Sequence, residues 1–112
     1  MRYQVAYQGQ ATAHDDDGRP IPHDPDELER HLEEIQDQLL ELDAADATVS
    51  AVLASGEVEI SVTVEAPTVD EAAKKGSSVI RTAIHAAGGF TPNWSVEWLS
   101  VHTDRVDALT NA

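Results

Sequence analysis

The chain opens with alternating large apolar and polar residues, which predict a strand. Tyr3, Val5 and Tyr7 alternate with glutamine and alanine, the period of two that is typical of a strand with one buried face. Residues 9–23 then combine two glycines, two prolines and three consecutive aspartates, a composition that favours turns. We therefore expect a short strand over residues 2–8 and a long acidic loop over residues 9–23.

Several helix-start signals follow this loop. Asp24 suits the N-cap, Pro25 the first helical position and Glu27 the third position of a capping box. Apolar side chains then recur three and four residues apart, at Leu28, Leu32, Ile35, Leu39 and Leu42, while acidic residues occupy the other faces. The pattern predicts a helix that ends near Leu42 and buries one side.

Two apolar-rich segments, residues 48–54 and 57–65, flank Ser55-Gly56 and predict a β-hairpin with a two-residue turn. This turn sets the expected register, in which Leu53 pairs with Val58, Ala51 with Ile60 and Val49 with Val62. The opposite face receives Glu57, Glu59, Ser61, Thr63 and Glu65. The second strand of the hairpin is therefore expected to have one core face and one polar face.

A second helix begins after Pro67, where Thr68-Val69-Asp70-Glu71 forms another capping box. Its apolar stripe consists of Val69, Ala72, Ala73, Gly76, Val79, Ile80, Ala83, Ile84 and Ala87. Gly88-Gly89 predicts its end, because glycine readily adopts the left-handed backbone that closes a helix. The small residues, Gly76 among them, indicate that this helix packs closely against its neighbours.

Residues 94–103 are rich in β-favouring residues and predict the last strand. Its buried face is ambiguous, because Trp94, Val96 and Trp98 occupy one face of a regular strand whereas Leu99, Val101 and Thr103 occupy the other. Either a β-bulge switches the faces midway or both faces are partly covered. Residues 106–112 are expected to form a frayed tail.

The expected elements follow the ferredoxin-like βαββαβ order. Right-handed crossovers then give an α+β fold, with a four-stranded antiparallel sheet of order 4-1-3-2 and two helices on one face. At 112 residues the chain has room for one such domain, over residues 1–105, and for no second domain.

Three segments carry a resemblance to a family. They are the hairpin Ala-Ser-Gly-Glu at 54–57, the strand Ile-Ser-Val-Thr-Val-Glu-Ala at 60–66 and the closing Leu-Ser-Val-His-Thr at 99–103. Together with the acidic first helix, they resemble small actinobacterial proteins of unknown function. The resemblance covers most of residues 1–105 and implies only the fold, since its motifs are strands and caps. The acidic loop and the two tryptophans depart from the family pattern.

Charge narrows the choice of partners. Twenty-one acidic residues against seven basic ones give a formal net charge of −14, which repels nucleic-acid backbones and anionic lipid surfaces. The chain contains no cysteine, and it has neither an N-terminal signal pattern nor an apolar run long enough to span a membrane. We therefore expect a cytoplasmic protein without nucleic-acid or membrane contacts, whose acidity serves solubility.

Residues capable of chemistry are few and poorly grouped. His14, Asp15, Asp17 and His23 offer ligand atoms for a divalent metal, but the spacing matches no known calcium loop and a flexible loop makes a poor zinc frame. Ser77 and Ser78 lie near Arg81 and His85 on a predicted helix surface, without the strained turn that exposes a nucleophile. We expect no metal, no cofactor and no catalytic residue, hence no enzyme.

The remaining candidates are surfaces. In a ferredoxin-like fold one sheet face lacks helices, and the first interpretation places Trp94, Val96 and Trp98 on that face as an interface for a second copy or another protein. A second interpretation places these residues in the core. The first predicted helix is acidic, whereas the second carries Lys74, Lys75 and Arg81. These opposite charges either attract each other within the domain or make the acidic helix a docking face.

Two other functions stay open. One is a small-molecule regulatory domain of the ACT-like kind, which shares this architecture and requires an ordered pocket at residues 9–23. The other is an acidic inhibitor that occupies the nucleic-acid site of a basic protein, which requires carboxylates spaced like phosphates along one face. The leading hypothesis is a non-enzymatic, self-associating interaction module.

Overall fold

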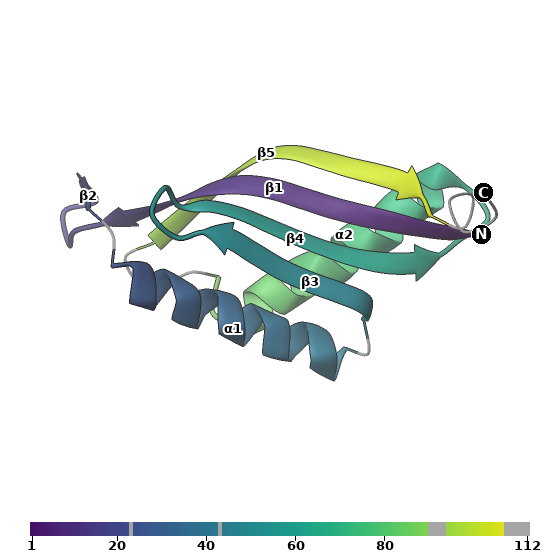
Figure 1. The fold of residues 1–112 in the computed structure, drawn as a ribbon, viewed down its shortest axis with the longest axis horizontal. Coiled ribbons are helices and arrows are strands. Elements are labelled where there is room, and N and C mark those ends of the chain that lie inside the picture. Colours follow the sequence, from purple (N-terminus) through teal and green to yellow (C-terminus); the bar gives the residue numbers. More distant parts are fainter. Residues whose placement is uncertain (23, 43, 90–93, 107–112) are drawn as a thin grey trace.

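A computed structural model describes residues 1–22, 24–42, 44–89 and 94–106 of the chain. Its elements are β1 (Arg2–His14), β2 (Pro20–Ile21), α1 (Pro25–Glu41), β3 (Ala45–Val52), β4 (Glu57–Glu65), α2 (Val69–Ala86) and β5 (Trp94–Arg105). The fold is α+β, as predicted, with two helices and an antiparallel sheet of five strands (Figure 1). The last six residues of the expected tail, 107–112, lie outside the described residues.

The four long strands lie in the order β5-β1-β4-β3, and every neighbouring pair is antiparallel. In Figure 1, β5 and β3 form the two long edges of the sheet, and α1 runs beside β3. The short strand β2 pairs with the end of β1, at Ala13 and His14. This additional strand departs from the expected order of six elements, because the predicted loop at 9–23 contains strand structure.

Strand β1 is longer than the sequence pattern predicted. It continues through Gly9, Ala11 and Ala13, which keep the alternation of Tyr3 to Tyr7 but use small side chains. A Cβ atom on Gly9 would come within 2.6 Å of the ring of Trp98 on the neighbouring strand. The small residues thus make room for bulky side chains of β5. The alternation of large apolar residues stops before them, which is why the sequence pattern predicted a shorter strand.

The segment after β1 is a tight turn rather than a structureless loop. The Asp15 N–H donates to the carbonyl of Arg19, 2.9 Å away. The carboxylate of Asp15 accepts hydrogen bonds from the backbone N–H groups of Asp17 and Arg19, at 3.0 and 2.9 Å. Gly18 has a φ of 81°, which suits glycine. These contacts return the chain to β2.

Helix α1 begins as the sequence predicted. The Oδ1 of Asp24 accepts a hydrogen bond from the N–H of Asp26, 2.9 Å away, and Pro25 occupies the first turn. The carboxylate of Glu27 has a different role from the expected capping box, since its Oε1 accepts a hydrogen bond from Nε1 of Trp94 at 2.9 Å. This bond ties the start of α1 to the start of β5.

Both ends of helix α2 are also where the sequence predicted them. Thr68 Oγ1 accepts from the N–H of Glu71, 3.2 Å away. At the other end, the N–H groups of Gly88 and Gly89 donate to the carbonyls of His85 and Ile84. This pair of bonds, together with φ values of 99° and 63° at the two glycines, is the Schellman arrangement.

The expected register of the β3–β4 hairpin is wrong by two residues. Ala51 pairs with Val58 and Val49 with Ile60, because the connection spans four residues, 53–56, and not two. The N–H groups of Ser55 and Gly56 both donate to the carbonyl of Val52. A shift by an even number of residues keeps each side chain on its predicted face, so Val62 still points into the core.

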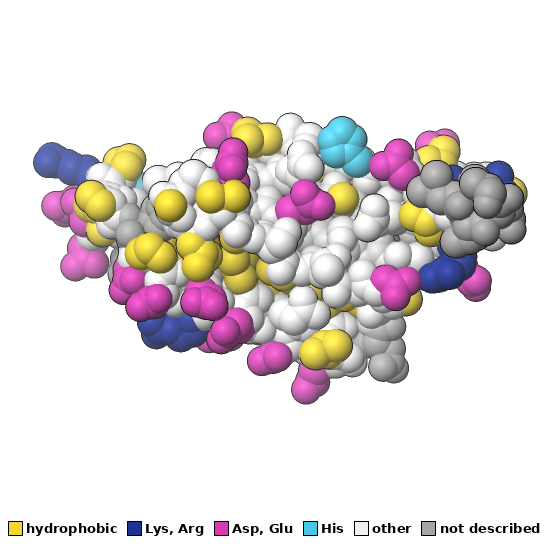
Figure 2. Space-filling model, in the orientation of Figure 1, with side chains coloured by type: hydrophobic (Ala, Val, Ile, Leu, Met, Phe, Trp, Pro, Cys, Tyr) yellow, Lys and Arg dark blue, Asp and Glu magenta, His cyan; other side chains and the backbone are white. Residues whose placement is uncertain are grey.

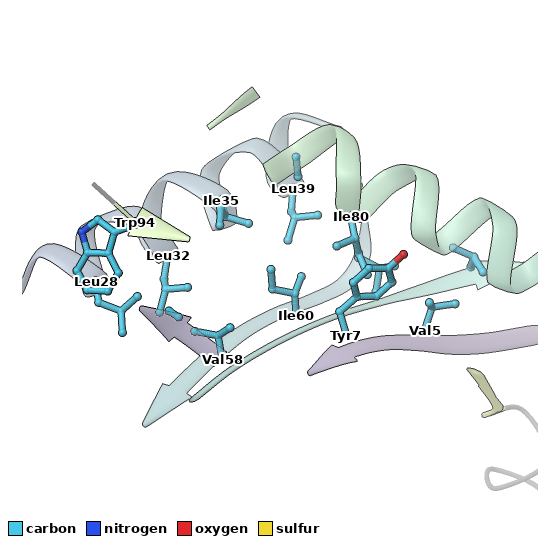
Figure 3. Packing of buried hydrophobic residues seen from close by; sticks show 14 of the residues in the cluster. Val5, Tyr7, Leu28, Leu32, Ile35, Leu39, Val58, Ile60, Ile80 and Trp94 are labelled. Carbon is cyan, nitrogen blue, oxygen red and sulfur yellow. The ribbon is translucent and has the colours of Figure 1, made fainter. Parts of the chain in front are cut away.

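The core lies between the sheet and the two helices, which pack on the same face (Figure 3). Its fully buried large side chains are Val5, Leu28, Ile35, Leu39, Ile60, Val62 and Ile80. Ser61 and Thr63 on β4 face away from the helices as predicted, but they are buried as well. A central strand is flanked on both sides, so neighbouring side chains cover its small polar residues even without a helix above them.

Candidate interaction surfaces

A β-bulge decides which face of β5 is buried. Gln8 pairs with Ser100, and the next residue of β1, Gly9, pairs with Trp98. Leu99 is therefore an extra residue without a partner on β1. The extra residue inverts the alternation, so Trp98 before it and Val101 after it lie on the same face. Of the two predicted explanations, the bulge is the one observed.

The predicted aromatic patch on the uncovered sheet face is not formed. Trp94, Val96 and Trp98 are cross-strand partners of Ala13, Ala11 and Gly9, and they lie with them on the helix-covered face. The side chain of Trp94 is 6% exposed and lies near Leu28 (Figure 3). Val96 and Trp98 are partly buried and pack against the core. Trp94 is therefore a core residue, consistent with the second interpretation.

Trp98 and Trp94 each contact another aromatic ring. The ring of Trp98 meets that of Tyr7 edge-on, with centroids 5.5 Å apart. The ring of Trp94 meets that of His31 on α1 in the same way, at 5.9 Å. Such edge-to-face pairs add about 0.5–1.5 kcal/mol to the burial of the rings themselves. Both tryptophans thus stabilise the attachment of β5 to the rest of the fold.

The uncovered face of the sheet is polar and satisfies its own hydrogen bonds. Gln8 bridges two neighbours, because its Oε1 accepts from Ser100 Oγ and its Nε2 donates to Glu59 Oε2, each at 3.1 Å. Thr48 Oγ1 and Ser61 Oγ share a hydrogen bond of 2.6 Å. The centre of this face is mainly neither hydrophobic nor charged (Figure 2). Its apolar area is confined to one hollow of about 530 Å³, whose lining includes Val52 and Leu99.

The outer edge of β5 is a better candidate. The strand has 12 residues and pairs with β1 on one side, while no strand in the described parts of the chain pairs with its other side. It contains neither lysine nor proline, the residues that commonly protect such edges. Two residues of the strand itself, Leu99 and Val101, are 65% and 49% exposed. These features make the edge a candidate for pairing with a further strand, although the β-bulge at Leu99 interrupts its regular backbone.

The candidate metal ligands do not converge. His14 Nε2 shares a hydrogen bond of 2.6 Å with Ser95 Oγ, and the carboxylate of Asp15 is engaged in its own turn. Asp17 is exposed, and His23 lies outside the described residues. In the described part of the chain, no group of three or more histidine, aspartate or glutamate side chains is arranged to hold a metal ion.

We expect calorimetry to detect no micromolar binding of zinc, calcium or manganese. The reason is that His14 and Asp15 already have protein partners and would lose them on turning toward a metal. Binding heat that disappears in the double variant His14→Ala, His23→Ala would contradict this expectation.

The predicted surface cluster on α2 holds no catalytic arrangement in the described residues. Ser77, Ser78 and Arg81 line a shallow groove of about 510 Å³ with Lys74 and Thr82. No hydrogen bond among the described residues joins either serine side chain to His85; the backbone carbonyl of Ser78 accepts from Thr82 Oγ1 at 2.7 Å. A nucleophile needs a base within hydrogen-bond reach.

Comparisons with known proteins do not identify a family or a function for this chain. No protein-family model matches the sequence, and no curated protein matches it. The resemblance to small actinobacterial proteins therefore stays an expectation from the sequence. None of the helices in the described ranges is both long enough and apolar enough to cross a membrane.

Proposed function

We propose that this protein is a non-enzymatic interaction module that self-associates through the outer edge of β5. The observation that carries the proposal is the long strand edge without a strand partner among the described residues, beside the exposed side chains of Leu99 and Val101. An exposed edge of this length promotes pairing with another chain. Pairing with one specific strand would occupy this edge and so prevent aggregation through it.

The proposed architecture is a ferredoxin-like fold with one addition. Two helices on one sheet face and the order β5-β1-β4-β3 of the long strands support this assignment. The short strand β2 is the addition, and it extends one end of β1. The absence of cysteine from the chain suits a reducing cytoplasm, where we propose that the module acts.

A second copy is the partner that fits this edge most simply. Two β5 strands related by a twofold axis run antiparallel, so the same backbone groups pair on both sides. The strand carries Glu97, Asp104 and Arg105 as its formally charged residues, which is a much weaker negative field than that of α1. A face-to-face dimer is less favourable, since it would bring the like-charged carboxylates of Glu57 and Glu59 of both copies together.

Sedimentation near physiological salt tests the proposal with a double variant of the edge. We expect the wild-type protein to be a dimer and the variant Leu99→Lys, Val101→Lys to be a monomer with an unchanged circular dichroism spectrum. Lysine on an edge strand opposes pairing through its charge. Higher salt should strengthen the wild-type dimer, because it screens the net charge of −14 on each copy.

The control variant is Gln4→Lys, Ser50→Lys, which adds the same two charges at exposed positions of the uncovered face on β1 and β3, away from the edge of β5. We expect it to remain dimeric. A wild-type monomer at high protein concentration would refute self-association. If the control dissociates and the edge variant does not, the copies associate through the sheet face and not through the strand edge.

A further inference from the structure

The opposite edge of the sheet carries a groove along β3. The groove has a volume of about 290 Å³ and lies between β3 and α1. One wall is the outer side of β3 and the connection after it, at Val49, Ser50, Ala51 and Leu53; the other is α1, at Glu29, Leu32, Glu33 and Gln36. Figure 2 shows hydrophobic side chains along this seam and acidic side chains of α1 on its lower side.

The backbone of β3 presents hydrogen-bonding groups to this groove. The N–H of Ala11 donates to the carbonyl of Gly56, so alternate residues of β4, beginning with Val58, turn their backbone groups toward β1. Following the alternation through the β3–β4 pairs, Val49 and Ala51 direct their N–H and C=O groups away from β4. No strand in the described ranges pairs with that side of β3.

The groove combines an apolar floor with an acidic rim. Leu32, Val49 and Ala51 are buried or partly buried at its base, whereas Glu29 and Glu33 are exposed along its edge. Arginine and lysine match this combination, because their aliphatic stems lie on apolar surface while their charged ends reach outward.

The spacings of helix and strand also agree. Glu29 and Glu33 are one helical turn apart, which is about 6 Å along α1. Alternate residues of a strand are about 6.6–6.8 Å apart and point to the same side. Basic side chains at alternate positions of a strand added to β3 would therefore face the two carboxylates in succession.

We infer that this groove binds an extended segment of a basic protein, which adds as a strand to β3 and places arginine or lysine at alternate positions against Glu29 and Glu33. Strand addition beside a helix supplies affinity through the backbone and specificity through alternate side chains. The site is separate from the β5 edge, since β3 and β5 form opposite edges of the sheet.

Fluorescence anisotropy with two labelled peptides tests the site. The first peptide alternates arginine and threonine over eight residues, and the second has the same composition with the four arginines in one block. We expect the alternating peptide to bind about tenfold more tightly, a difference of about 1.4 kcal/mol. On its binding, hydrogen exchange at the amides of Val49 and Ala51 should slow.

Two charge-reversal variants of α1 distinguish binding in the groove from the general attraction of a basic peptide to an acidic protein. Glu29→Lys, Glu33→Lys should weaken binding of the alternating peptide at least about tenfold. Glu34→Lys, Glu41→Lys makes the same charge change at exposed positions outside the groove and should have little effect. Equal binding of both peptides, equal loss in both variants, unchanged exchange at β3 or no binding would each overturn the inference.

Discussion

We expect Val62→Asp to leave the protein unfolded at room temperature. Val62 lies at the centre of β4, is 1% exposed and faces the two helices. An unpaired carboxylate at such a position costs several kcal/mol, against a total stability of about 5–15 kcal/mol for a typical domain. Circular dichroism and urea titration measure the loss directly.

His102→Asp is the matched control for this substitution. His102 is exposed on the uncovered face of β5, opposite Ala6, so an added carboxylate remains hydrated. We expect the unfolding free energy to change by less than about 1 kcal/mol. Thr63→Asp should fall between the two, because Thr63 faces away from the helices but is only 9% exposed. A stable Val62→Asp protein would show that this face of β4 is not the core.

Gly76→Ala has the second largest expected effect. A Cβ atom at Gly76 would overlap the side chain of Val5, which is itself fully buried under α2. Alanine favours a helix over glycine by about 1 kcal/mol, but overpacking a well-filled core costs typically about 1–3 kcal/mol. We expect the overlap to dominate, so that urea unfolding gives a net loss of stability.

Two further variants test whether the steric overlap causes this loss of stability. Ser78→Ala, at an exposed position of the same helix, should be neutral or slightly stabilising, because it changes helix propensity without a steric overlap. Adding Val5→Ala to Gly76→Ala should produce a smaller loss than the sum of the two single changes, since removing the valine methyl groups makes room for the new Cβ. If Gly76→Ala stabilises the protein, α2 does not lie closely on β1.

Both helices could be predicted from the sequence, because their signals are local. Asp24 and Thr68 cap N–H groups two and three residues away, and Gly88-Gly89 closes α2 through carbonyls of its own last turn. The apolar stripes likewise follow from helical spacing. The predicted α+β class and the core position of Val62 depend on the same short-range patterns, which explains why they agree with the structure.

The pairing of the strands, in contrast, depends on contacts that the sequence pattern does not show. The hairpin register depends on the length of a connection, and the face of Trp94 depends on the extra residue Leu99 several positions away. The continuation of β1 through Gly9 requires the indole of Trp98 on another strand. The groove beside β3 and the open edge of β5 depend on which strands lie outermost. Contacts between residues far apart in the chain set these features, and no local pattern of hydrophobic and polar residues encodes them.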